Sequence, residues 1–148
     1  MNAQKLVLIR GLPGSGKTTF ARETLWEGFK VFATDDYFET ENGYSFIPSQ
    51  LGKAHEDCQR RTKEALDAGC DVAVTNTFTQ RWEMEAYLRM LFRTEIQLWV
   101  VDLFDAGLLD EQLSMRNSHG VPCPSIKKMR ERYEFDWKNG NPLPPWQR

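Results

Sequence analysis

The sequence has few of the residues that build metal sites and disulfide frameworks. Among its 148 residues are three cysteines, Cys58, Cys70 and Cys123, and two histidines, His55 and His119, and no Cys-x-x-Cys pair occurs. These numbers and spacings argue against a zinc site and against a disulfide framework. A reducing compartment is therefore the simpler expectation.

Long apolar runs and an excess of positive charge are also lacking. No segment approaches the length of a transmembrane helix, and the N-terminal residues do not contain the apolar core of a signal peptide. The net charge is -2, so there is no global positive field, and contact with nucleic acid would need a local basic patch. We expect a cytoplasmic protein, in the host cytoplasm if a phage encodes it, with neither a membrane nor zinc among its partners.

The sequence does contain a regular alternation of apolar runs and amphipathic segments. A chain of 148 residues with 41% hydrophobic content is long enough for one domain, residues 1–148, with a core of its own. The apolar runs predict strands at residues 5–10, 30–34, 71–77 and 95–104, and helices are expected after the first run and at 49–68, 79–91, 107–115 and 125–137. This alternation predicts an α/β fold with a parallel sheet of about four to five strands flanked by helices.

The most specific motif is GLPGSGKT, Gly11–Thr18, which matches G-x-x-x-x-G-K-[ST] at every fixed position. It follows an expected strand and opens an expected helix, so its backbone N–H groups and the helix N-terminus can surround phosphate. We expect ATP and Mg²⁺ here, with Lys17 on the β- and γ-phosphates and the Thr18 hydroxyl on the metal. The residues expected to bind ATP are Gly11, Leu12, Pro13, Gly14, Ser15, Gly16, Lys17, Thr18 and Thr19.

A P-loop alone does not define the reaction. In many motors and switches, an aspartate that ends an apolar strand helps to hold Mg²⁺, and LWVVD, ending at Asp102, is either such a strand or an ordinary sheet edge. A kinase instead needs a carboxylate that orients and deprotonates the acceptor hydroxyl. ATDDYF places Asp35 and Asp36 at the carboxyl end of the second strand, where ligands bind. Adjacent residues point in opposite directions, so at most one faces the phosphates and the other is a turn residue.

Several segments, in this order, resemble the kinase domain of phage-type polynucleotide kinase: GLPGSGKTTFAR, DDYF, AVTNTFTQRWEMEAY, VVDLFD, and MRNSHGVP followed by MRERYE. They resemble still more closely a group of small single-domain P-loop kinase-like proteins from phages and bacteria. The resemblance extends to about Tyr133. It implies a kinase with a helical lid, in which Lys17 grips phosphate, Asp35 is the general base and Arg116 lies in the lid over ATP. An arginine there would neutralise charge during transfer; the alternative is a solvated loop charge.

Three positions depart from the polynucleotide kinase pattern. Phe38 replaces an arginine that clamps the phosphate beside the target hydroxyl, Asn76 replaces an aspartate that supports the acceptor site, and His119 or a short deletion replaces a second lid arginine. Without a phosphate clamp, aromatics near the base favour a nucleoside or base-sized acceptor, although the alternative places most of them in the core. The residues expected to bind the acceptor are Asp36, Tyr37, Phe38, Asn76, Phe78 and Trp82.

The preferred acceptor from the sequence is the 5-hydroxymethyl group of 5-hydroxymethyluracil in DNA, because the chain is similar in size and motifs to phage kinases that act on this base. Such an enzyme must take the base out of the stack. The alternatives are a kinase for the 5′-hydroxyl of a polynucleotide, and an ATPase or nucleotide-switched binding module without an acceptor. Two basic groups are candidates for DNA contact unless they are solvated helix faces: Arg60, Arg61 and Lys63, and Lys127, Lys128, Arg130 and Arg132. The oligomeric state cannot be predicted.

Overall fold

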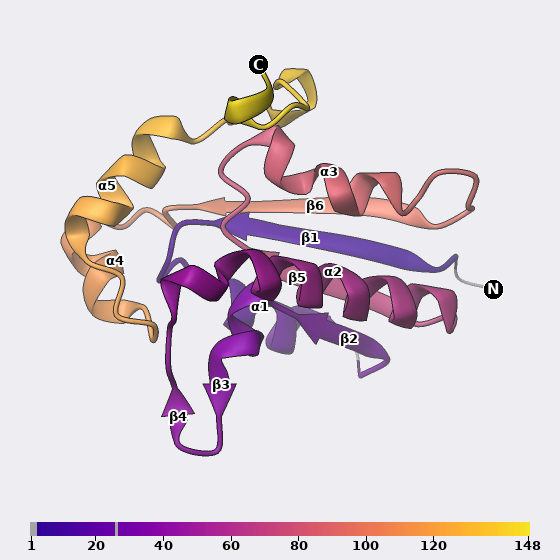
Figure 1. Cartoon of the computed structure of the whole chain (residues 1–148), viewed down its shortest axis with the longest axis horizontal. Helices are drawn as coiled ribbons and strands as arrows, with labels where there is room; N and C mark the ends of the chain where they lie inside the picture. The colour runs from indigo at the N-terminus through magenta and orange to yellow at the C-terminus, as the bar shows by residue number, and fades with distance from the viewer. Residues whose placement is uncertain (1–2, 26) are drawn as a thin grey trace.

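The computed structural model, which describes residues 3–25 and 27–148, is built around one parallel sheet (Figure 1). Across the sheet the strands run in the order β2 (Phe29–Phe32), β5 (Asp71–Asn76), β1 (Lys5–Gly11) and β6 (Gln97–Phe104). All three pairings are parallel, and β1 lies between β5 and β6. The predicted α/β class with a flanked parallel sheet is confirmed.

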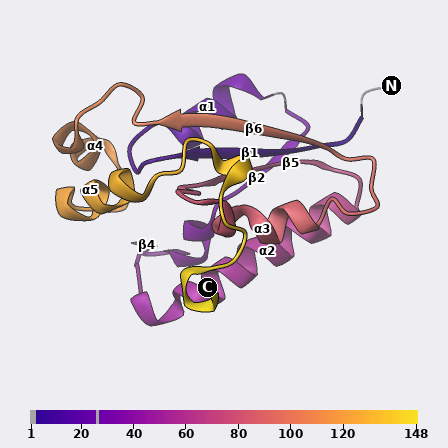
Figure 2. The same ribbon diagram turned by 90° about the horizontal axis from the view of Figure 1, so that it is seen from above.

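Helices cover both faces of the sheet, as parallel strands require. Figure 2 shows α1 (Lys17–Thr24) on one face and α2 (Leu51–Asp67) and α3 (Arg81–Arg89) on the other. The larger apolar cluster lies under α2 and α3, and the smaller one lies under α1. Every residue of β1 is buried, which explains why it appears in the sequence as a continuous apolar run.

The second strand ends two residues earlier than predicted, at Phe32 rather than Thr34. A 3₁₀ turn, η1 (Thr34–Phe38), takes over because the Asp36 carboxylate accepts a hydrogen bond from the Ala33 N–H at 2.8 Å. A local side-chain bond of this kind competes with strand pairing.

Residues 39–49, which lie between the second expected strand and the helix expected from residue 49, contain a small antiparallel hairpin. It consists of β3 (Glu39–Thr40) and β4 (Gly43–Tyr44), followed by the 3₁₀ turn η2 (Pro48–Gln50). Gly43 has a φ of +103°, in the left-handed region, and the Thr40 hydroxyl donates to its carbonyl at 2.7 Å. The chain therefore reverses here instead of running on as an open loop.

Two short helices, α4 (Asp110–Arg116) and α5 (Cys123–Arg132), lie beyond the carboxyl ends of β1 and β6 (Figure 1). They pack on the P-loop through an apolar cluster of Leu12, Leu113, Ile126 and Tyr133. The last predicted helix ends at Arg132 rather than Trp137, because Tyr133 has an extended backbone and its ring turns into this cluster.

The C-terminal segment returns along α3. It contains the 3₁₀ turns η3 (Trp137–Asn139) and η4 (Pro145–Gln147), and the Trp146 ring meets Trp82 edge-on at 5.2 Å between centroids. In the described part of the chain, no helix combines the length and apolar character needed to cross a membrane.

Candidate active site

The loop between β1 and α1 is shaped by glycines that no other residue could replace without strain. Gly14 and Gly16 have φ angles of +82° and +94°, which L side chains rarely adopt. A Cβ on Gly14 would lie 2.4 Å from the carbonyl oxygen of Leu113 in α4. The lid helix therefore rests directly on the loop backbone.

The interior of the loop contains polar groups that fit a phosphate ligand. The Ser15 hydroxyl is buried and has no hydrogen-bond partner among the described residues. The Lys17 ammonium donates to the Gly11 and Leu12 carbonyls at 2.9 and 3.1 Å. Burial lowers the pKa of Lys17 to about 8, although the nearby Asp35 carboxylate opposes the shift. An anion placed here would supply the charge compensation that this ammonium lacks.

The remaining predicted ATP residues lie around this loop in different environments. Leu12 is fully buried, Pro13 is half-buried, and Thr18 and Thr19 are exposed at the start of α1. The Thr18 hydroxyl is thus available to ligate Mg²⁺ beside a bound nucleotide. No group of three or more His, Cys, Asp or Glu side chains is arranged to hold a metal within residues 3–25 and 27–148.

The contact between Gly14 and Leu113 makes a testable prediction. Gly14→Ala should weaken ATP binding about tenfold or more, because the new Cβ strains the left-handed backbone and collides with the Leu113 carbonyl. The matched control is Gly52→Ala in α2, where a Cβ would meet nothing within 4 Å. Isothermal titration calorimetry with a non-hydrolysable ATP analogue measures the affinity of both variants. Equal affinities would contradict the prediction.

The two adjacent aspartates take different roles. The Asp36 carboxylate accepts from the Ala33 N–H and lies 3.4 Å from an Arg61 guanidinium nitrogen, so it stabilises the turn. Asp35 Oδ1 accepts from the Tyr44 hydroxyl at 2.9 Å, and its Oδ2 lies 3.1 Å from His119 Nδ1. Asp35 is therefore the carboxylate that faces the lid and the P-loop lysine.

Asp35 is held ionised. Burial alone would raise its pKa, but hydrogen bonds from His119 and Tyr44, and the charge of Lys17, lower it below its ordinary value of 3.8. Hydrogen bonds to the charged form stabilise that form. At neutral pH the group is therefore a carboxylate, the state in which it can accept a proton.

Two residues, Tyr44 and His119, contact this carboxylate although the sequence did not predict either contact. Tyr44 reaches Asp35 because the hairpin folds back, and the His119 imidazole stacks on its ring with centroids 4.2 Å apart. His119 comes from the turn between α4 and α5, which Asn117 holds by accepting from the His119 and Val121 N–H groups at 3.2 and 2.8 Å. No local pattern brings residues 35 and 119 together, so only the fold reveals this contact.

Arg116, the predicted lid arginine, is exposed at the end of α4. Its guanidinium makes no hydrogen bond or ion pair with the residues that the structure describes. An exposed arginine on the helix that packs against the P-loop through Leu113 is compatible with a role at phosphate, and its assignment stays a prediction.

The predicted acceptor residues divide into buried and accessible groups. Phe38 and Phe78 are each 2% exposed; Phe38 packs on Phe46 at 5.0 Å, and Phe78 packs on Tyr87 at 5.5 Å between ring centroids. Neither ring is placed to stack on a base in this structure, because the apolar interior already encloses both. The alternative interpretation, that most of these aromatics belong to the core, fits these two.

Asn76, Trp82 and Tyr37 are more accessible. The Asn76 side-chain oxygen accepts from the Thr34 N–H at 2.9 Å, so it ties the end of β5 to the turn that carries Asp35. The half-buried Trp82 indole donates to Gln80 at 2.9 Å, and Tyr37 is 36% exposed. These three residues, unlike Phe38 and Phe78, keep surface that an acceptor could contact.

Asp102 pairs with a buried arginine that directly precedes the P-loop, while its own side chain stays 34% exposed. It lies 3.4 Å from the Arg10 guanidinium and accepts from the Tyr133 hydroxyl at 2.6 Å. Arg10 is fully buried, and it also donates to the carbonyls of Phe78 and Thr79 at 3.0 and 3.1 Å. Of the two interpretations of Asp102, the structure favours a structural role, because its oxygens already serve Arg10 and Tyr133.

The basic groups considered for DNA contact are largely paired with acids. In α2, Arg60 and Arg61 both bridge to Asp57 at 2.8 Å, and Lys63 pairs with Asp67. Pairs of this kind, three or four residues apart, are typical of solvated helix faces. In α5, Arg130 bridges to Asp105 and Asp110, while Lys127 and Lys128 are exposed. The solvated-face interpretation thus fits α2, and α5 keeps two lysines for other contacts.

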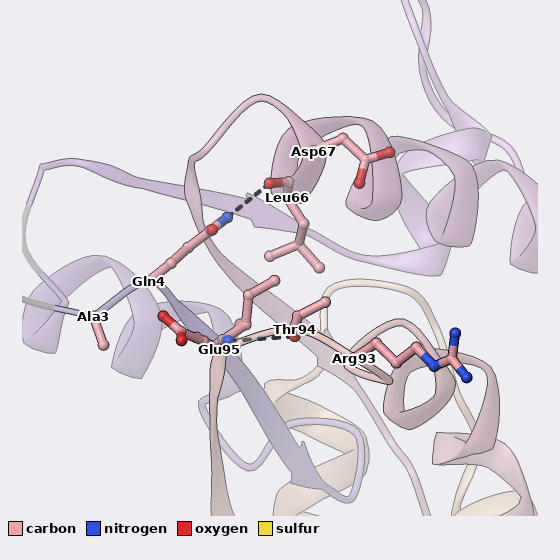
Figure 3. A pocket seen from close by; sticks show the side chains of 8 residues that line it. Ala3, Gln4, Leu66, Asp67, Arg93, Thr94 and Glu95 are labelled. Atoms are coloured by element: carbon pink, nitrogen blue, oxygen red, sulfur yellow. Dashed lines mark hydrogen bonds between the residues drawn. The ribbon is translucent and has the colours of Figure 1, made fainter.

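A separate hollow of about 490 Å³ lies at the opposite, amino-terminal edge of the sheet (Figure 3). Gln4 points into it from the start of β1 and donates to the carbonyls of Leu66 and Cys70, each at 2.8 Å. The ligands of parallel α/β sheets bind at the carboxyl edge, so this hollow is remote from the residues discussed above.

The glycine loop, the central parallel sheet and the helical lid define a P-loop domain with a kinase-like fold. A family model described as AAA domain matches residues 6–135. Since this is most of the chain, the chain belongs to that family.

Two curated relatives are similar in sequence. Human NEDD4-binding protein 2 is 38% identical over 141 residues, which cover 87% of this chain and 8% of that protein. The 2′,3′-cyclic-nucleotide 3′-phosphodiesterase of Mus musculus is 29% identical over 141 residues, covering 89% of this chain and 32% of the relative. The chain thus spans less than a third of the length of either relative.

Two solved structures are similar in fold. A chain of the Pnkp1/Rnl/Hen1 RNA repair complex aligns with a TM-score of 0.67 and 20% identity, over 89% of this chain and 44% of its own. A sugar kinase from Janibacter sp. HTCC2649 aligns with a TM-score of 0.59 and 18% identity, over 97% of this chain and 89% of its own. These similarities confirm the predicted kinase-like fold.

Proposed function

We propose that this domain is an ATP-dependent kinase that transfers the γ-phosphoryl group to a hydroxyl of a nucleic acid. The observation that carries the proposal is the position of Asp35. An ionised carboxylate lies at the sheet edge next to the P-loop, close enough to influence the charge of Lys17. A nucleotide switch or simple ATPase has no need of such a base, whereas a kinase requires one.

Each residue of the site has a defined task in this reaction. Gly11–Thr19 bind the phosphates, Lys17 and Arg116 stabilise the charge on the transferring group, and the Thr18 hydroxyl would help to hold Mg²⁺, which neutralises phosphate charge when bound. Asp35 orients the acceptor hydroxyl and takes its proton. The hydroxyl oxygen forms the new bond to the γ-phosphorus, the bond to the β–γ bridging oxygen breaks, and ADP leaves with that electron pair.

For the acceptor, we place the 5′-hydroxyl of a polynucleotide first. The sequence favours 5-hydroxymethyluracil through its resemblance to phage kinases and an expected aromatic pocket, but the burial of Phe38 and Phe78 leaves that pocket without two of its expected walls. The relatives and fold neighbours support a nucleotide substrate only by their names, one a cyclic-nucleotide phosphodiesterase and one part of an RNA repair complex. The 5-hydroxymethyl group remains the second candidate because Tyr37 and Trp82 keep accessible surface.

A labelling experiment separates these acceptors. The protein is incubated with γ-labelled ATP and each of three oligonucleotides: 5′-hydroxyl RNA, 5′-hydroxyl DNA, and 5′-phosphorylated DNA that contains 5-hydroxymethyluracil. We expect label on the 5′ ends, with an unmodified 5′-phosphorylated DNA as the matched blank. Label only on the modified DNA would establish the second candidate, and label released only as free phosphate in every reaction would overturn the kinase assignment.

A further inference from the structure

Both oxygens of the Asp35 carboxylate are already engaged, and the two donors come from different parts of the fold. Tyr44 reaches Oδ1 from the β3–β4 hairpin at 2.9 Å. His119 lies 3.1 Å from Oδ2 and belongs to the turn between the lid helices α4 and α5. A base that accepts two hydrogen bonds is stabilised as the anion and so is a weaker proton acceptor.

The Tyr44 contact is the permanent one of the two. Tyr44 is nine residues from Asp35, on a hairpin paired through Glu39 and Tyr44, and its ring packs on buried Phe38 at 6.3 Å between centroids. Burial and the bond to Asp35 raise the pKa of Tyr44. Its hydroxyl therefore stays protonated at neutral pH and remains a donor to Asp35.

The His119 contact depends on the position of the lid. The imidazole reaches Asp35 across more than eighty residues of sequence, its side chain is 31% exposed, and it rests on the Tyr44 ring with an interplanar angle of 21°. Asn117 sets the shape of this turn through bonds within the lid itself. A shift of α4 and α5 would therefore carry His119 away from Asp35 without unfolding the turn.

We propose that His119 is a positioning residue that holds Oδ2 of Asp35 in the empty enzyme, and that the acceptor hydroxyl takes its place there. This inference rests on the kinase function proposed above. Tyr44 keeps the carboxylate oriented throughout, while the departure of His119 frees an oxygen and restores the basicity of Asp35 when the acceptor arrives. The lid thus opposes acceptor binding by direct competition for one atom.

The competition should depend on pH. The groups that face His119 are Asp35, Glu39 with its carboxylate 4.0 Å from Nε2, the Tyr44 ring and the opposing charge of Lys17. The Asp35 hydrogen bond leads the causes that raise the pKa of His119 above its ordinary value of 6.5. A raised histidine pKa means that the contact is strongest below pH 6.5 and is lost as the pH rises through the raised value. Acceptor binding should therefore improve as the solution becomes more alkaline.

The contact itself can be tested without any activity measurement. We expect NMR titration of the imidazoles in the whole chain to place the pKa of His119 above 6.5 and that of His55 below it, since burial lowers the His55 pKa. Asp35→Asn should return His119 towards 6.5. A His119 that titrates at its ordinary value in both proteins would overturn the proposal whether or not the protein is a kinase.

The competition is tested with the acceptor that the labelling experiment identifies. At pH 6, His119→Ala should lower the KM for the acceptor about tenfold, as expected for the loss of a competing charge-assisted hydrogen bond, and should remove the pH dependence of that KM. His55→Asn is the matched control, and its KM for the acceptor should keep the pH dependence of the original protein. An unchanged or higher KM in His119→Ala, with the pH dependence intact, would contradict the competition. If no oligonucleotide is phosphorylated, the kinase function fails, while the titration still decides the contact.

Discussion

Asp35→Asn should lower the rate of phosphoryl transfer by about 10²- to 10⁴-fold, the usual contribution of a general base. The amide keeps the size of the side chain and can still accept the Tyr44 hydroxyl, which now lies 2.9 Å from Oδ1, but it cannot take a proton. ATP affinity should change little, because the phosphates are bound by the loop and Lys17. Single-turnover kinetics measure the chemical step, and titration with an ATP analogue measures the affinity.

Asp36→Asn is the matched control. The neighbouring carboxylate accepts from the Ala33 N–H at 2.8 Å and lies 3.4 Å from Arg61, and an asparagine oxygen can accept the same backbone bond. We expect its transfer rate to stay within a few-fold of the original protein. If Asp36→Asn alone removed transfer, the base would be Asp36, and the orientation seen in the structure would not be the reactive one.

Arg10→Met should destabilise the protein by about 1 to 3 kcal/mol, the cost of removing a fully buried donor from the acceptors that it serves. The guanidinium is fully buried, and its loss leaves the Phe78 carbonyl without its donor, the Thr79 carbonyl with only the Glu134 N–H, and Asp102 without its ion pair. Because Arg10 immediately precedes Gly11, the loop should also bind ATP more weakly. Chemical denaturation, followed by circular dichroism, measures the loss in the free energy of unfolding.

The control for this change is Arg89→Met. Arg89 is exposed near the end of α3, and substitutions at such surface positions usually stay within about 0.5 kcal/mol. If Arg10→Met and Arg89→Met unfolded at the same denaturant concentration, the network around Arg10 would contribute no net stability. The double variant Arg10→Met, Asp102→Leu then tests whether the cost comes from the unpaired acid.

The main elements of the fold could be predicted from the sequence because their causes are local. The four predicted apolar runs correspond to the four strands of the parallel sheet, and GLPGSGKT spans the end of β1, the loop and the start of α1. Boundaries were less accurate wherever a side chain intervened. The Asp36 carboxylate ended β2 early, and the inward turn of Tyr133 ended α5 early. These contacts depend on the positions of other segments of the chain, and apolar periodicity contains no information about those positions.

The candidate site also has features that can be predicted from local sequence and features that depend on the fold. Its glycine loop and its adjacent aspartates are recognisable because phosphate binding and base placement need those residue types at fixed spacings. The hydrogen-bond partners of Asp35 cannot be recognised in the sequence. Tyr44 reaches it only because a hairpin forms, and His119 only because the lid turn folds across the sheet edge. Two of the aromatics follow the alternative interpretation, since Phe38 and Phe78 have the chemistry of a stacking surface but lie in the interior.

Local spacing and apolar pattern in the sequence are sufficient to predict an α/β domain with a phosphate-binding loop. The tertiary structure was needed to place Asp35, rather than Asp36, near Lys17 and the lid, to pair the buried Arg10 with Asp102, and to bring a lid histidine onto the expected base. Each of those outcomes depends on side chains brought together from distant parts of the chain. Their meeting follows from the packing of the whole sheet and its helices, which no single segment encodes.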